Sequence, residues 1–538
     1  MMNRQLLIYN ANILSSHDGF ARGNADALVV TGQLIEAVGK LEDIETLAGP
    51  HAQLINAKGR TLMPGLHDTH IHLWKVGNLL TYMLDLRNST SLDEMLSLLE
   101  QYDRLYPEAD WITARGFNEA TWKEGRMPTK KDLDKIIKDR PVYVIRTCAH
   151  IAVCNSKALE VCGITATTRA PEGGGIYKDD SGQPNGLFSE TALGLVTAHI
   201  PPYNKEQLKT MIRVARKELY RHGITAATDP AVDPLLLEAY YEMEEAGELG
   251  FRLQAIPILL PDGGGQPFPL PRYFSSEYMS VNTVKFFSDG GLSGRTAALK
   301  RYYKGSAGPG TTGQRSADQG ILRLQEEQYL SLCRAAQEQG LGIATHAIGD
   351  AAIEFVIGIY RQLHGSFPSG LKRIEHLGLP EEQHLRDMST LNIATSMQTI
   401  FLKELGKNFI KYLDDEYLRR CYPVRSVLQH GILTALSSDA PVVKDLNPFS
   451  GMKAAITRRD EEGHSIAPEE SIGIKDALQA YTGAAAKISA LPQLGSLEPG
   501  RPADFILLDK DPLECPPETL DSMQVTATFV GGLQKLPT

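Results

Sequence analysis

Between residues 63 and 490, short apolar runs of strand length alternate with stretches in which apolar residues recur at helical spacing. This alternation favours βα units and a parallel sheet. The runs with strand character are 64–73, 223–230, 251–260, 281–290, 341–350, 371–379, 392–400 and 431–440. Helical stretches with an apolar stripe fall between them at 326–340, 351–365 and 380–391. Because eight parallel strands close a (β/α)8 TIM barrel, we expect an α/β fold of this type.

The two ends of the chain have a different pattern. Residues 5–62 and 494–532 contain short β-rich runs separated by Gly, Asn, Asp and Pro. About 150 residues separate the first two predicted barrel strands, far more than one crossover helix needs. We therefore expect a small composite β-sandwich from 1–62 and 491–538, a barrel from 63–84 and 206–490, and an inserted subdomain, 85–205, that covers the barrel mouth.

Composition narrows the class of protein. The chain has 538 residues, 42% of them hydrophobic and 22% charged, as in ordinary soluble globular proteins. A net charge of -10 and interspersed acidic and basic residues argue against nucleic acid as a partner. The first residues lack the apolar run of a signal peptide or membrane span, so we expect a cytoplasmic protein that binds no membrane. Six scattered cysteines without a CxxC pair indicate reduced thiols.

A His-x-His sequence ends the first predicted strand. His70 and His72 are two positions apart, so in an extended strand their side chains project to the same side, about 7 Å apart. Neutral imidazole is the commonest protein ligand of zinc. The pair predicts half of a metal site, and the alternative is a pair of packed core histidines.

Other residues of ligand type stand near the ends of later predicted strands. They are Lys285 on the fourth strand, His346 on the fifth, His376 on the sixth and Asp439 on the eighth. The carboxyl ends of barrel strands converge on one rim, so these groups should meet there. We predict that His70, His72 and Asp439 bind one divalent cation, and that His346 and His376 bind a second. Zinc suits these ligands, with manganese or iron as alternatives, and one or two ions remain open.

Lys285 needs modification before it can join such a site. Its ammonium group has donors and no lone pair. A desolvated neutral amine would add carbon dioxide and form a carbamate whose oxygens bridge two metal ions. Asp289, Asp229 and Glu190 are alternative anionic bridges, and an ion-paired interior lysine is the alternative explanation for Lys285.

In this order the residues resemble the ligand set of the amidohydrolase superfamily. The segment 495–513 also resembles that superfamily's return into its β domain. More narrowly, segments 116–134, 150–159, 288–299 and 346–353 resemble amidohydrolase family 3, the branch of YtcJ-like proteins and N-substituted formamide deformylase. At 148–150 the chain has Cys-Ala-His where relatives often have Asp-Gly-His, a change that metal binding should survive.

The resemblance implies a metal-dependent hydrolase of a small molecule. We expect a metal-bound hydroxide to attack the carbonyl of an amide, N-acyl or N-formyl compound and so hydrolyse its C–N bond, with Asp439 as general base and acid. Decarboxylation or isomerisation at the same site, or a non-catalytic binding protein, are the alternatives. Whether the chain forms a homo-oligomer stays open.

The resemblance also indicates substrate-binding residues. They are Trp122, His150 and Asn155 in the inserted subdomain and Arg295 after the fourth strand. Arg295 would bind a carboxylate in a bidentate manner or polarise a carbonyl. The alternatives are a salt bridge for Arg295, subdomain packing for Trp122 and a helix N-cap for Asn155.

Overall fold

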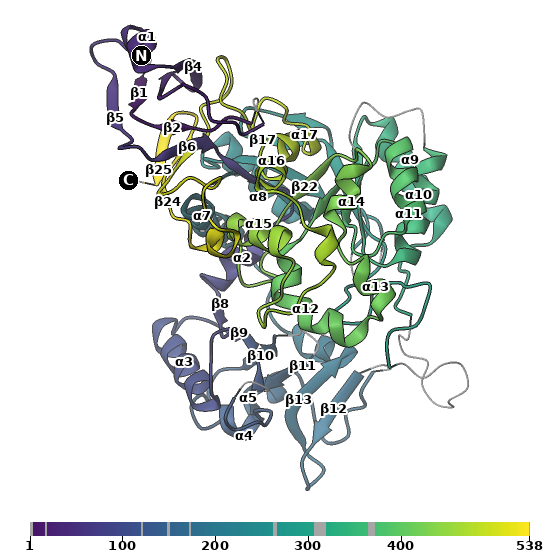
Figure 1. Cartoon of the computed structure of the whole chain (residues 1–538). Coiled ribbons are helices and arrows are strands. Elements are labelled where there is room, and N and C mark those ends of the chain that lie inside the picture. Colours follow the sequence, from purple (N-terminus) through teal and green to yellow (C-terminus); the bar gives the residue numbers. More distant parts are fainter. Residues whose placement is uncertain are drawn as a thin grey trace. The chain divides into compact units, whose positions relative to one another are not determined.

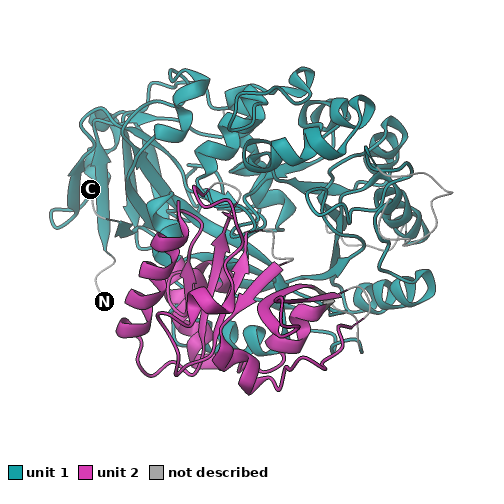
Figure 2. Ribbon diagram, turned by 90° about the horizontal axis from the view of Figure 1, so that it is seen from below, with its two compact units in different colours: residues 1–73, 216–538 teal, residues 74–215 magenta. Residues whose placement is uncertain are grey.

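The computed structural model describes residues 4–16, 19–119, 122–147, 151–171, 174–261, 266–305, 319–363 and 372–536, with the side chains of 190 and 191 left out. The chain divides into two compact units (Figure 2). Unit 1 comprises Met1–Leu73 and Arg216–Thr538, and unit 2 comprises Trp74–Ala215. The limits 85–205 for an inserted subdomain, and its place over the barrel mouth, stay predictions.

Unit 1 contains parallel strands that follow one another in chain order. Their bounds are β7 (Leu66–Asp68), β14 (Ile224–Val232), β15 (Arg252–Pro257), β17 (Met279–Val281), β18 (Thr283–Phe287), β19 (Gly342–Ala347), β20 (Lys372–His376), β21 (Ala394–Met397) and β22 (Thr434–Leu436). The short β16 (Phe274–Ser275) pairs antiparallel with β17. Each of the eight runs predicted as strands overlaps one of these strands.

These strands form two sheets whose edges are joined. One sheet has the order β16-β17-β15-β14-β7 and the other β18-β19-β20-β21-β22. A parallel bridge between Ile258 and Lys285 joins β15 to β18. The edge strands on the other side of the two sheets are β7 and β22. The segments that follow them are joined, because the backbone N–H of Asp439 donates to the carbonyl of His70 at 2.7 Å. The parallel strands therefore follow the order of a (β/α)8 barrel, and the predicted α/β fold is confirmed.

Helices lie between most of the parallel strands, and further helices follow β22. Their bounds are α2 (Leu73–Leu79), α7 (Lys205–Arg221), α8 (Pro234–Glu245), α9 (Glu326–Glu338), α10 (Asp350–Gln362), α11 (Glu382–Thr390), α12 (Ile400–Tyr412), α13 (Asp415–Arg419), α14 (Val424–Gln429), α15 (Pro448–Thr457), α16 (Ile474–Ala480) and α17 (Gly483–Ile488). The helical stretches predicted from the sequence are α9, α10 and α11, and α10 and α11 lie side by side (Figure 1). On α10 the buried residues Ile353, Val356, Ile357 and Tyr360 recur at helical spacing.

The two ends of the chain meet in two further sheets of unit 1. The strands are β1 (Gln5–Tyr9), β2 (Asn12–Ile13), β3 (Ala27–Thr31), β4 (Leu34–Gly39), β5 (Gln53–Asn56), β6 (Thr61–Pro64), β23 (Phe505–Leu508), β24 (Val525–Val530) and β25 (Leu533–Leu536), with α1 (Leu41–Ile44) between β4 and β5. The sheet orders are β4-β3-β1-β5 and β2-β6-β23-β24-β25 (Figure 1). One core holds Leu6 and Leu28 with Phe505 and Phe529, whose rings are 4.6 Å apart. N-terminal and C-terminal segments thus share one sheet and one core.

Unit 2 has a sheet in the order β12-β13-β11-β10-β9-β8. Its elements are β8 (Met83–Asp85), α3 (Leu92–Leu105), β9 (Ile112–Phe117), α4 (Lys130–Leu133), β10 (Val142–Arg146), β11 (Ile151–Cys154), α5 (Ser156–Val161), β12 (Gly174–Lys178), β13 (Pro184–Glu190) and α6 (Gly194–Thr197). The side chain of Ser91 caps α3 by accepting from the N–H of Glu94 at 3.1 Å. Helix α3 buries Met95 and Leu99 in the core beside β9.

Candidate metal centre

The His-x-His pair follows a barrel strand instead of lying on it. The expectation that both histidines lie on the strand is wrong, because β7 ends at Asp68. The Oδ1 atom of Asp68 accepts the N–H of His70 at 3.1 Å and that of Ser438 at 3.2 Å. These bonds turn the chain out of the strand ladder. The rings of His70 and His72 still lie close, with centroids 5.6 Å apart.

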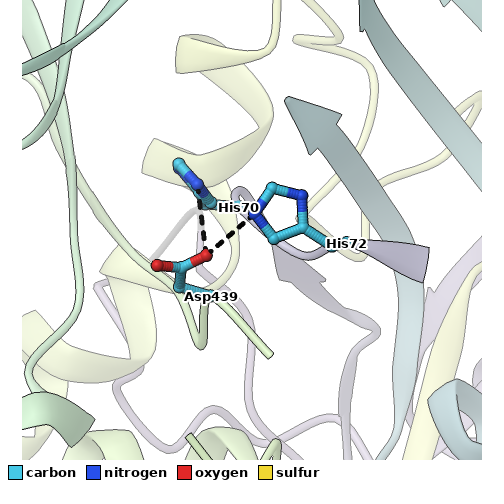
Figure 3. A group of neighbouring side chains, drawn as sticks. All are labelled: His70, His72 and Asp439. Atoms are coloured by element: carbon cyan, nitrogen blue, oxygen red, sulfur yellow. Dashed lines mark ion pairs between the residues drawn. The ribbon is translucent and has the colours of Figure 1, made fainter. Parts of the chain in front are cut away.

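His70, His72 and Asp439 converge on one point (Figure 3). The Oδ1 atom of Asp439 lies 3.4 Å from Nε2 of His70 and 3.2 Å from Nε2 of His72. One ligand atom from each residue lies within 4.8 Å of the others, and all three residues are buried. Two imidazoles and a carboxylate form a common ligand set of catalytic zinc sites. The donor set therefore fits a divalent ion.

His70 is held in place by a buried ion pair behind it. Its Nδ1–H donates to Oε2 of Glu375 at 2.6 Å. Arg373 binds Glu375 with two nitrogens, Nη2 at 3.1 Å from Oε2, and also donates to the carbonyl of Thr69 at 2.8 Å. Because the proton sits on Nδ1, the lone pair of Nε2 faces Asp439. Carboxylate–histidine pairs of this kind orient metal ligands and raise their basicity.

Burial and nearby charge keep the imidazole of His70 neutral. Burial lowers the pKa of His70 well below its usual value, and the positive charge of Lys285 lowers it further. For Glu375, burial acts in the opposite sense and raises the pKa. The charges of Arg373 and Lys285 outweigh burial, so the net pKa of Glu375 is lowered. An ionised Glu375 facing a neutral His70 suits a metal ligand.

The second predicted pair, His346 and His376, lies beside the first. The ring of His376 is 4.3 Å from that of His346 and 4.7 Å from that of His70, centroid to centroid. The Nδ1–H of His376 donates to Oε1 of Gln398 at 2.6 Å, which leaves Nε2 as an acceptor. The Nε2–H of His346 donates to the carbonyl of Gly290 at 3.1 Å, which leaves Nδ1. Burial lowers the pKa of His346 to about 3 and that of His376 well below its usual value.

Lys285 is buried on β18 within reach of these histidines. Its side chain has no exposed surface, and Nζ lies 5.0 Å from the ring centroid of Phe287. Its positive charge is one cause of the lowered pKa values of His346 and His376. Lys285 therefore lies on a buried strand that pairs with β19, the strand of His346, and its place among the metal ligands stays a prediction.

The two described alternatives to Lys285 as a bridge each lie beside a histidine of the cluster and also have other partners. The Oδ1 atom of Asp289 lies 3.4 Å from Nε2 of His346. Asp289 accepts the backbone N–H groups of Ala298, Ile348 and Gly349 at 2.8–3.1 Å. Burial raises the pKa of Asp289 to about 7, although these donors oppose the shift. Asp289 therefore ties together the loops that follow β18 and β19. The other alternative, Asp229, accepts the hydroxyl of Tyr240 at 2.7 Å and lies 3.9 Å from Nδ1 of His72. The side chain of Glu190 is outside the described part.

Two of the predicted substrate-binding residues have structural contacts within unit 2. Trp122 is buried against Phe117, and its Nε1–H donates to the carbonyl of Ser89 at 3.0 Å. Asn155 caps α5 by accepting the N–H of Ala158 at 2.9 Å. Its side-chain amide also donates to two backbone carbonyls, those of residues 137 and 140. These contacts explain both residues as structural, and a role in substrate binding stays a prediction.

The other two predicted substrate-binding residues are not brought to the cluster by any described contact. Arg295 is exposed in the loop after β18, with its guanidinium 5.5 Å from the ring centroid of Tyr412. His150 lies outside the described residues.

Sequence reasoning missed Glu375, Arg373 and Gln398, which hold the histidines from behind. The sequence contains a signal for Arg373 and Glu375. Arg373 and Glu375 alternate along β20, a strand whose five residues are all buried. Two opposite charges on one face of a buried strand indicate an internal ion pair.

Comparisons with known proteins show which family the chain belongs to. A family model described as the amidohydrolase family matches residues 53–534. The sequence is 29% identical over 517 residues to YtcJ of Bacillus subtilis (strain 168), covering 94% of this chain and 95% of that one. It is 28% identical over 543 residues to N-substituted formamide deformylase of Arthrobacter pascens, covering 98% of each. The structure is similar to an uncharacterized metal-dependent hydrolase from Pyrococcus horikoshii OT3, with a TM-score of 0.77, 25% identity and coverage of 96% and 99%.

Proposed function

The chain belongs to the amidohydrolase family, whose model matches residues 53–534, and we propose that it hydrolyses the amide bond of a small N-acyl or N-formyl compound. The family predicted from the sequence is confirmed. The protein is a metal-dependent hydrolase that acts on carbon–nitrogen bonds other than peptide bonds. The observation that carries the finer proposal is the position of Asp439 Oδ1 beside the Nε2 atoms of His70 and His72.

We assign the ligands of the metal centre as follows. His70, His72 and Asp439 would hold one divalent ion, with zinc as the first candidate. His346 and His376 would hold a second ion, and Lys285 would bridge the two as a carbamate. A bound divalent ion lowers the pKa of a coordinated water toward neutrality and polarises a carbonyl group. Support for this assignment comes from burial, the main cause that lowers the pKa values of His70 and His346, and from the contacts that orient the imidazoles.

Asp439 would carry the proton in the reaction. Its carboxylate faces the two imidazoles, so it can accept the proton of the attacking water and pass it to the departing amine nitrogen. The carbonyl carbon gains a C–O bond and loses its C–N bond, and the proton moves from oxygen to nitrogen. Asp439 has a φ of 56° just after β22, and its own N–H is bound to the carbonyl of His70. This backbone fixes the carboxylate at the site.

The substrate class rests on the relative from Arthrobacter. That protein is named for the deformylation of N-substituted formamides, and we extend this activity to the present chain as a proposal. A small-molecule substrate is consistent with the family. A cytoplasmic location, and the absence of nucleic acid and membrane as partners, stay predictions. Among the described residues no helix has both the length and the apolar character of a membrane span.

The experiment is a substrate screen with the metal-loaded protein. N-formyl and N-acyl amines would be incubated in isotopically labelled water, with a chelator-treated sample as control. We expect label in the released acid and loss of turnover after chelation, restored by zinc, manganese or iron. Turnover without incorporation of label would favour decarboxylation or isomerisation. A metal-free protein that is inactive across the screen would favour a binding protein.

A further inference from the structure

Unit 2 contains a cavity of its own, of about 410 Å³. It lies between the end of α3, the loop 106–111 and the segment 200–207. All of its lining residues belong to unit 2, whereas every residue of the metal cluster belongs to unit 1. This volume lies within the range of small-molecule sites, about 300–1,000 Å³. The proposed hydrolysis assigns no role to this cavity.

Aromatic rings dominate the wall of the cavity. They are Tyr82, Tyr102, Tyr106, Trp111 and Tyr203. Tyr102 and Tyr106 have ring centroids 4.5 Å apart, with an angle of 39° between the rings. Tyr82 and Tyr203 are 5.9 Å apart, with an angle of 35°. Aromatic faces carry negative electrostatic potential and attract cations, a contact that is used to bind quaternary ammonium groups.

Two carboxylates add negative charge to the same wall. Glu108 and Asp110 line the cavity and are exposed. Neither forms an ion pair with another described residue. The cation beside this loop is Arg140, which binds Asp103 and donates to the carbonyls of residues 106, 107 and 109. Arg140 therefore holds the loop, and Glu108 and Asp110 keep their charges for a ligand.

The end of α3 also lines the cavity. Tyr102, Leu105 and Tyr106, at the C-terminal end of this 14-residue helix, belong to its wall. The partial negative charge of this helix end is already met by Arg140, which donates to the carbonyls of Asp103 and Tyr106. An anionic ligand would still meet both carboxylates, and a purely apolar ligand would leave the carboxylates without partners.

We propose that the cavity binds an organic cation with an apolar or aromatic body, of the alkylammonium or arylammonium class. The aromatic rings contact the body and the cationic head of the ligand. Glu108 and Asp110 supply the opposite charge. This site is independent of the proposed amide hydrolysis, because it uses no residue of the metal cluster.

The test is calorimetric titration of benzyltrimethylammonium into the full-length, metal-loaded protein. Two uncharged compounds serve as controls. Benzyl alcohol has the aromatic body, and 3,3-dimethylbutan-1-ol has the shape of the head group without its charge. We expect saturable binding of the cation only, weakened by added salt because exposed charges are screened. Heat without saturation, or equal binding of an uncharged compound, would overturn the proposal.

Variants of the cavity locate the binding. Glu108→Gln combined with Asp110→Asn should weaken binding about threefold to thirtyfold, as should Tyr106→Leu, whereas Tyr106→Phe keeps the ring and the affinity. A matched control in unit 2 is Asp139→Asn combined with Asp180→Asn, which removes two exposed carboxylates outside the cavity wall. Asp439→Asn should leave binding of the cation unchanged. Two results would contradict a small-cation site. One is unchanged binding of the cation in the cavity variants. The other is a Tyr106→Leu protein whose oligomeric state, measured by sedimentation, differs from that of the unmodified protein.

Discussion

The carboxylate of Glu375 lies 2.6 Å from Nδ1 of His70, so the imidazole that faces Asp439 is held from behind by a buried acid. Glu375 is in turn bound by Arg373, and neither side chain has exposed surface. The pair links β20 to the loop after β7. This contact fixes both the position and the tautomer of the first proposed metal ligand.

We predict that Glu375→Gln weakens metal binding about tenfold to hundredfold, because the amide can no longer raise the basicity of His70. The change also leaves Arg373 without a full ion pair, so the free energy of unfolding should fall. Chelator competition, corrected for the folded fraction, measures the metal affinity. Glu338→Gln, an exposed residue at the end of α9, is the control. Metal affinity equal to that of the unmodified protein would show that Glu375 has only a structural role.

We predict that Lys285 carries a carbamate in the metal-loaded protein. Expression or incubation with isotopically labelled bicarbonate should give a carbamate carbon signal in the NMR spectrum. The signal should be absent in Lys285→Met and present in Lys372→Met, which removes another buried lysine on β20 of the same sheet. A signal that survives in Lys285→Met would place the modification elsewhere. Absence of the signal in the fully metal-loaded protein would mean that an unmodified residue forms the bridge.

Acid should destabilise unit 2 through Asp132. Its carboxylate accepts Nη1 of Arg126 at 2.8 Å and the N–H of Thr129 at 3.0 Å, at the start of α4. The side-chain bond from Arg126 is the main cause that holds the pKa of Asp132 well below its usual range, against the effect of burial. A lowered pKa stabilises the fold above the unfolded value of about 4, and this stabilisation is lost as the pH falls below it.

We therefore predict that Asp132→Asn lowers the free energy of unfolding by about 1 kcal/mol at neutral pH, with a smaller difference in acid. Urea unfolding at several pH values measures the difference. Asp139→Asn, an exposed residue with no described partner, is the control. A difference that stays constant from neutral pH to strong acid would refute the role of the Asp132 charge.

Much of the barrel could be predicted from the sequence because its strands are buried. In β18 (Thr283–Phe287) and β19 (Gly342–Ala347) every residue except Phe287 and His346 is buried. Strands of this kind read as short, nearly continuous apolar runs, and polar residues at their ends stand out. This is why Lys285, His346 and His376 were found together with the strands that bear them.

Contacts between distant segments could not be predicted in the same way. The partner of His70 is 305 residues away along the chain, and nothing in the local pattern around either residue pairs them. Strand β7 is only three residues long, so periodicity could not show that His70 lies beyond its end. The cavity of unit 2 likewise takes Tyr82, Tyr102 and Tyr203 from separate segments.

The most direct test is the turnover of Asp439→Asn at full metal occupancy, on the best N-formyl or N-acyl substrate from the screen. Elemental analysis would establish equal metal content, and the exposed Asp43→Asn on α1 is the control. The proposed role of Asp439 predicts a folded, metal-loaded variant whose turnover falls at least about 10²-fold, because the carrier of the proton is gone. Turnover close to that of the unmodified protein, at full occupancy, would contradict it.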